Sequence, residues 1–178
     1  QKIYVADNLA GLVNGIFDPV APQSGVNILL GVYAFAFQIY GDFAGYTNIA
    51  RGTSKLMGIE LIENFRFPYL VRTPQAFWRN WHISLSTWLR DYLYIPLGGS
   101  RGSEWQTRRN LFITMVLGGL WHGAAWTFVL WGIYHGVLLI AYRAAERAAW
   151  IRQVVAGAHP VSRIVSWAVM FHITCYGW

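Results

Sequence analysis

Charged residues are scarce in this 178-residue sequence: aspartate, glutamate, lysine and arginine together make up 12% of it. Soluble domains carry about 25% charged residues, so this chain has about half the usual solvating charge. Hydrophobic residues make up 55% of the sequence, and its ten tryptophans and ten tyrosines are the rings that gather at membrane–water interfaces. We therefore expect an integral membrane protein rather than a soluble domain with an unusually large core.

Cysteine and the common catalytic motifs are also nearly absent. Cys175 is the only cysteine, which excludes an intrachain disulfide and a multi-cysteine metal site, and we expect it to be a small packing residue. The sequence has no G-x-S-x-G elbow, no phosphate-binding glycine loop and no H-E-x-x-H helix. Its histidines do not have zinc spacing, so we expect no metal site. Histidine in apolar surroundings remains as the candidate chemistry.

The net charge of +6 is unevenly distributed. Nine of the fourteen basic residues lie between Arg51 and Arg109, in a block flanked by two apolar runs. That pattern is typical of a cytoplasmic segment and indicates contact with lipid headgroups or a phosphorylated acyl donor rather than nucleic acid. The sequence starts at Gln1 and stops at Trp178 inside an apolar run, without a signal-peptide pattern. We interpret it as an internal fragment of a multi-pass protein.

We predict an all-α, polytopic membrane domain in which residues 1–178 form part of one helical bundle. Residues 1–24 are predicted as an entry loop in which residues 7–20 are weakly helical. Residues 25–49 are predicted as a membrane helix, and 51–109 as interfacial helices on the cytoplasmic side. Residues 110–142 are too long for one straight span and too short for two, so we expect broken, re-entrant membrane helices there. Residues 161–178 start a further span.

Asp42 lies within the first predicted membrane helix. Ionisable groups inside a span usually face the bundle or a water-filled cavity, so Asp42 is a candidate substrate-binding residue. A structural ion pair with a nearby arginine explains it equally well.

A helix is predicted to begin at Thr73, because a hydroxyl cap is followed by proline at the first helical position. We expect it to run to about Tyr94, where Pro96 and two glycines stop it. Helical spacing places Arg79, His82, Ser86 and Arg90 on one polar stripe and the large aromatic and aliphatic side chains on another. This division favours a helix at the membrane interface.

The stretch VLGGLWHGAAWTFVLWGIYHG carries two histidines, His122 and His135, and five glycines. Gly118, Gly119 and Gly123 weaken the helix around His122, so we expect a break there. A buried imidazole stays neutral and can accept a proton from a hydroxyl. The alternative is a core histidine that donates to a backbone carbonyl.

The other histidines carry weaker signals. His82 on the polar stripe is either functional or in contact with lipid headgroups. His135 lies thirteen residues after His122, on a largely different face of an unbroken helix, and we expect a packing or interfacial role. His159 and His172 show no pattern.

Four segments resemble the membrane-bound O-acyltransferase (MBOAT) family, and within it the bacterial branch that O-acetylates exported polysaccharides such as alginate. They are GDFAGYTNIARG, FWRNWHISLSTWLRDYLYIPLGG, NLFITMVLGGLWHGAAWTFVLWGIYHG and FHITCYGW. The resemblance implies a multi-pass enzyme of the bacterial inner membrane that passes an acyl group, expected to be acetyl, from a cytoplasmic thioester such as acetyl-CoA to a hydroxyl on the far side, or to a partner protein there. No permanently bound cofactor is implied.

The resemblance also implies roles for individual residues. The essential histidine of the family lies in its Trp-His-Gly motif, which is His122 here, and a second one lies in the Arg-Asn-Trp-His-Ile-Ser-Leu-Ser motif, which is His82 here. Arg79 and Arg90 are candidates for steering a phosphate-bearing donor. The implied partners are membrane lipids, extracytoplasmic acetylation proteins and a polysaccharide acceptor.

Three other functions stay open. D-alanyl transfer to teichoic acid is performed by more distant members of the same family. A proton-coupled transporter would use His122 and Asp42 as a relay. A non-catalytic scaffold would only recruit the acetylation proteins.

Overall fold

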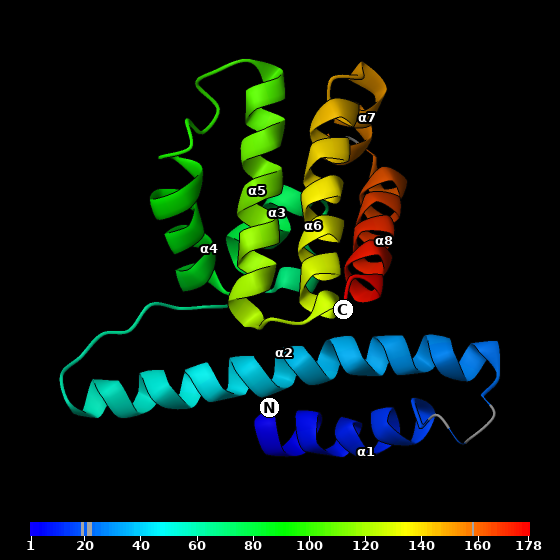
Figure 1. Cartoon of the computed structure of the whole chain (residues 1–178). Helices are drawn as coiled ribbons and strands as arrows, with labels where there is room; N and C mark the ends of the chain where they lie inside the picture. Colours follow the sequence, from blue (N-terminus) through cyan, green and yellow to red (C-terminus); the bar gives the residue numbers. More distant parts are fainter. Residues whose placement is uncertain (19, 21–22, 158) are drawn as a thin grey trace. The chain divides into compact units, whose positions relative to one another are not determined.

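The computed structural model describes residues 1–18, 20, 23–157 and 159–178, and every regular element in these ranges is helical. The all-α fold predicted from the sequence is therefore confirmed. The chain divides into two compact units, residues 1–65 and residues 66–177. Figure 1 traces both along the chain. Within these described ranges, two helices are long and apolar enough to cross a membrane, Gly25–Leu56 and Trp126–Ala145, and the bent pair Ala149–Ala156 and Pro160–Tyr176 would be a third span if it crosses as one.

The first unit is a helical hairpin. It consists of a π-helical turn η1 (Lys2–Ala6), helix α1 (Asp7–Ile16) and the long helix α2 (Gly25–Leu56), which lies alongside α1 (Figure 1). The Ser24 hydroxyl accepts a hydrogen bond from the Asn27 amide at 3.2 Å, which caps the first turn of α2. Glycine allows the close approach of the two arms, since a Cβ atom at Gly45 would overlap the backbone of Lys2.

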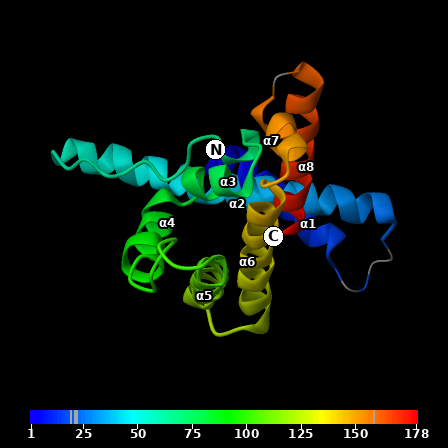
Figure 2. The same ribbon diagram turned by 90° about the horizontal axis from the view of Figure 1, so that it is seen from above.

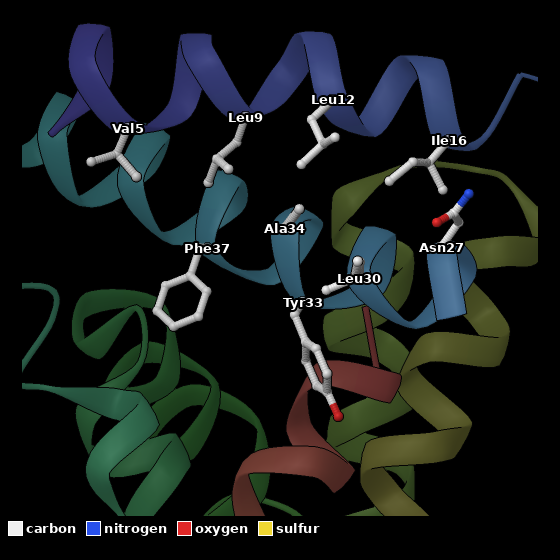
Figure 3. Close-up of a pocket in the computed structure, with 9 residues that line it drawn as sticks. All are labelled: Val5, Leu9, Leu12, Ile16, Asn27, Leu30, Tyr33, Ala34 and Phe37. Atoms are coloured by element: carbon white, nitrogen blue, oxygen red, sulfur yellow. The ribbon is translucent and has the colours of Figure 1, made fainter. Parts of the chain in front are cut away.

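An apolar groove of about 620 Å³ runs between α1 and α2. Figure 3 shows side chains from both helices along it, including Leu9, Leu12, Leu30 and Phe37. The prediction of an entry loop over residues 1–24 is wrong for residues 2–16, which are helical. The apolar side chains that α1 packs against α2 recur at helical spacing, and they outweigh the helix-weakening glycines Gly11 and Gly15. Helix α2 also continues to Leu56, beyond the predicted end at residue 49.

The second unit begins with short elements and continues with longer helices. The short elements are a 3-10 turn η2 (Pro68–Leu70), α3 (Pro74–Asn80), α4 (Ile83–Leu89) and a π-helical turn η3 (Arg90–Tyr94). They are followed by α5 (Glu104–His122), α6 (Trp126–Ala145), α7 (Ala149–Ala156) and α8 (Pro160–Tyr176). Figures 1 and 2 both show α6 beside α5.

Helices α5 and α6 form a tight antiparallel hairpin. A Cβ atom at Gly132 would lie 2.5 Å from the Met115 carbonyl oxygen and 2.9 Å from the Val116 Cα atom, so only glycine fits at this crossing. At the other end of the hairpin, Glu104 pairs with Arg143 at 3.2 Å and with Arg147 at 2.7 Å. These contacts fix the two helices relative to each other along their length.

The start of α5 is defined by its cap. The Ser103 amide donates to the Gln106 side chain at 2.7 Å, and the Gln106 amide donates to the Ser103 hydroxyl at 3.3 Å. This reciprocal capping box fixes the helix start at Glu104, which is earlier than the predicted boundary at residue 110. Helix α8 joins the bundle through two hydrogen bonds: the Tyr134 hydroxyl donates to the Ile173 carbonyl at 2.6 Å, and the Trp167 indole donates to the Tyr69 carbonyl at 2.9 Å.

Candidate active site

His82 lies at a sharp corner between α3 and α4. Its backbone has φ 42° and ψ 57°, a left-handed conformation that residues other than glycine adopt at a cost of about 1–3 kcal/mol. Helix α3 ends at Asn80, Trp81 is extended, and α4 starts at Ile83. The expectation of one continuous helix from residue 74 to residue 94 is therefore wrong, although the predicted Thr73 cap is confirmed by its 3.0 Å bond from the Ala76 amide.

The corner has a packing cause. The Trp81 ring is buried and stacks on Phe77 at a centroid distance of 5.5 Å and an interplanar angle of 19°. The Ser86 hydroxyl, in the first turn of α4, donates to the Trp81 carbonyl at 2.9 Å. Burying Trp81 turns the chain, and His82 leaves the polar stripe on which helical spacing placed it.

His122 is the last residue of α5, directly before the break. Gly123 follows it at φ 158°, and a Cβ atom there would lie 2.9 Å from the Phe128 ring. The chain then resumes as α6 at Trp126, so the predicted break near Gly119–Gly123 is confirmed. His122 is exposed in this chain, and the rings of neighbouring residues pack against its imidazole at the end of the helix.

The two histidines meet at Trp121. The His82 ring centroid lies 6.0 Å from that of Trp121, which in turn lies 5.1 Å from that of His122. Burial, and to a lesser extent the nearby His122, together lower the pKa of the half-buried His82 to about 4. His82 is therefore neutral at physiological pH and can offer one ring nitrogen as an acceptor and the other as a donor.

Other aromatic rings enclose His122 on the side of α6. Phe128 stacks on it at 5.8 Å and 28°, and Trp131 meets it edge to face at 5.2 Å and 81°. Trp131 also contacts His135, with a distance of 4.8 Å between the two ring centroids. His135 is buried, with 1% of its surface exposed, and lies parallel to Phe77 at 6.2 Å. The sequence placed His135 apart from His122, but the break lets both rings contact Trp131.

A cavity of about 460 Å³ lies among α3, α4, η3, α5 and α6. Its wall combines apolar side chains with polar ones: Gln75, Trp78, Arg79, Ser86, Thr87, Arg90, Tyr94 and Thr114. Two polar atoms of lining residues, Gln75 Oε1 and Trp78 Nε1, are buried without a hydrogen-bond partner among the described residues. Gln75 Oε1 is an acceptor and Trp78 Nε1 is a donor, and the two residues lie one turn apart on α3. Sequence patterns alone gave no sign of Gln75 or Trp78 as site residues.

The two predicted arginines both line this cavity and are both exposed at its rim. Arg90 is held by Asp91 through two bonds, Nε to Oδ1 at 2.7 Å and Nη2 to Oδ2 at 3.1 Å. Arg79 has no ion-pair partner in the part of the chain that the structure describes, so its charge is available to an anion.

Asp42 belongs to the first unit, where its carboxylate pairs with the Lys2 ammonium group. The partner expected for a structural role was an arginine, and a lysine from the π-helical turn takes that place.

Apolar helices of membrane-spanning length, together with two histidines whose rings both contact Trp121, define a helical membrane protein with a candidate proton-transfer site. The chain belongs to the membrane-bound O-acyltransferase family, whose model matches residues 17–177. The resemblance seen in the sequence motifs is thereby confirmed.

Relatives with assigned names match most or all of the chain. It is 46% identical over all 178 residues to the "Probable alginate O-acetylase AlgI" of Pseudomonas aeruginosa, and 38% identical to the peptidoglycan O-acetyltransferase of Helicobacter pylori. It is 33% identical, over 84% of its length, to the teichoic acid D-alanyltransferase of Bacillus subtilis. The chain spans about a third of the length of these relatives: 32%, 33% and 39%, respectively.

Proposed function

We propose that this chain is the histidine-bearing part of a membrane O-acyltransferase that moves an acetyl group from a thioester donor to a hydroxyl of an exported polysaccharide. The observation that carries the proposal is the meeting of His82 and His122 at Trp121, in a chain whose relatives include named polysaccharide O-acetylating proteins. We place the protein in the bacterial inner membrane as a multi-pass protein, with extracytoplasmic acetylation proteins and membrane lipids as partners.

In this proposal His122 is the general base. Its neutral imidazole accepts the proton of the acceptor hydroxyl while the hydroxyl oxygen attacks the thioester carbonyl. The new C–O ester bond forms, the C–S bond breaks, and the leaving thiolate takes up the proton. His82, uncharged at neutral pH because of its lowered pKa, orients the donor or relays the proton.

The cavity suits the pantetheine arm of an acyl thioester. Its volume of about 460 Å³ falls in the range of about 300–1,000 Å³ that small-molecule pockets occupy. The arm carries amide groups, and Gln75 Oε1 and Trp78 Nε1 offer one acceptor and one donor for them. Arg79 and Arg90 at the rim attract the phosphate to which the arm is attached.

The test compares His122→Ala and His122→Asn with His172→Asn in a strain that lacks its own copy of the gene. His172 is exposed on α8, so its variant controls for the loss of an imidazole elsewhere. O-acetyl content of the exported polysaccharide is measured, with the amount of protein in the membrane as a reference. We expect both His122 variants to lose acetylation and His172→Asn to retain it.

The outcomes also separate the alternatives. Normal acetylation in His122→Ala at normal protein levels contradicts the proposal and favours a scaffold, provided that deletion of the gene abolishes acetylation. Failed export with normal acetylation favours a transporter. Loss of D-alanine from teichoic acid, with no change in acetyl content, favours D-alanyl transfer.

A further inference from the structure

Trp131 occupies the centre of the ring cluster beside His122. Its ring contacts rings from three helices: His122 at the end of α5, Trp78 on α3 at 5.6 Å and 84°, and His135 on α6 itself at 4.8 Å and 60°. Trp78 is also packed against His135 at 5.1 Å, which closes the cluster on itself. Trp131 therefore contacts Trp78 and the buried His135 on one side and His122 on the other.

The backbone at Trp131 is fixed as firmly as its ring. The next residue, Gly132, sits at the tight crossing with Met115 and Val116 of α5. Because the neighbouring atoms are backbone atoms, Trp131 cannot shift along α6 without separating the two helices. The position of the indole is thus set by the hairpin that also carries His122.

His122 itself lacks comparable support. It is the terminal residue of a helix, is followed by glycine, and is exposed in this chain. Its ring orientation depends on the rings around it, of which Phe128 is stacked and Trp131 perpendicular. Phe128 and Trp131 lie one turn apart on α6, so their rings contact the face and the edge of the same imidazole.

We propose that Trp131 is a positioning residue that holds the His122 imidazole in the orientation required for proton transfer. This inference rests on the proposed function. A base acts only when its nitrogen lies within hydrogen-bond reach of the proton it removes, and a displacement of about 1 Å costs up to about 100-fold in rate. The effect is expected chiefly in kcat, because Trp131 contacts the His122 ring directly and touches the proposed donor cavity only through Trp78.

The experiment uses the purified full-length protein with an acetyl thioester donor. Trp131→Leu removes the ring, Trp131→Phe leaves a smaller ring, and Trp126→Leu is the matched control, since Trp126 is 81% exposed on the same helix. We expect kcat to fall about 30-fold in Trp131→Leu and about 5-fold in Trp131→Phe, with the KM of the donor within about twofold of the original. Trp126→Leu retains its kcat.

A second readout does not depend on activity. Diethyl pyrocarbonate modifies exposed imidazoles, and mass spectrometry of the His122 peptide gives its rate of modification in each variant. We expect this rate to rise severalfold in both Trp131 variants and to stay constant in Trp126→Leu. Trp131→Phe keeps the test decisive where Trp131→Leu fails to accumulate in the membrane.

Different experimental results contradict the role of Trp131 and the proposed function. Full activity of His122→Ala overturns the proposed function. Loss of activity in His122→Ala, combined with unchanged kcat and unchanged His122 modification in the Trp131 variants, overturns only the role of Trp131. A rise in donor KM without a fall in kcat also overturns it.

Discussion

Substitution of Gly132 by alanine is expected to destabilise the α5–α6 hairpin and to reduce activity together. The added Cβ atom would start 2.5 Å from the Met115 carbonyl oxygen, whereas ordinary contacts begin at 3.4 Å. The helices must therefore separate by about 1 Å at this point, because the backbone on the other side cannot rotate away. Overpacking of this kind costs about 1–3 kcal/mol.

A second glycine supplies the control. Gly52 lies within helix α2, and a Cβ atom there meets nothing within 4 Å. Alanine at either position gains the higher helix propensity, about 0.5–1 kcal/mol, so Gly52→Ala isolates that gain. We expect Gly132→Ala to be about 1–3 kcal/mol less stable than Gly52→Ala.

The assay is SDS titration of each purified variant in mixed micelles, followed by far-UV circular dichroism, together with the rate of acetyl transfer. The shift at Gly132 moves Trp131 relative to His122, so we expect a fall of about 10–100-fold in rate for Gly132→Ala and none for Gly52→Ala. Unfolding free energies of the two variants that agree within about 0.5 kcal/mol, with equal rates, would refute the reasoning.

Three further predictions concern pH, the donor and topology. The pKa of His82 is about 4 in the folded state, below the ordinary value of about 6.5, because the folded state keeps the ring neutral. The free energy of unfolding is therefore highest above pH 6.5 and declines as the pH falls toward 4. His82→Gln is expected to reduce that decline in a pH series of unfolding curves, and an unchanged series contradicts the assignment. Arg79→Gln should raise the donor KM about 3–10-fold at low salt and less at high salt, with kcat constant; a salt-independent KM argues against phosphate recognition. A cysteine at Arg101 should react with an impermeant maleimide only from the cytoplasmic side, over a low background because Cys175 is 1% exposed; labelling from the outside reverses the topology.

The sequence allowed prediction of the all-helical fold, the Thr73 cap and the break after His122, because each rests on a local signal. Proline, glycine and hydroxyl caps act within one turn of the chain, and their effect does not depend on distant residues. The helix over residues 2–16 had only a weak helical signal, interrupted by glycines, and the corner at His82 had none. The first is stabilised by packing against α2, and the second by burial of Trp81 against Phe77, so tertiary contacts decided both.

The relation of His135 to His122 shows why site geometry was harder to predict than helix content. On a continuous helix, residues thirteen positions apart lie on largely different faces, which argued for separate roles. The break at Gly123 ends that angular relation, because α6 starts a new helix whose face is set by its packing on α5 at Gly132. Trp131 then lies between the two histidine rings, 5.2 Å from one and 4.8 Å from the other. A helix break therefore does more than expose a side chain, since it lets residues that the helical period separates share one aromatic neighbour.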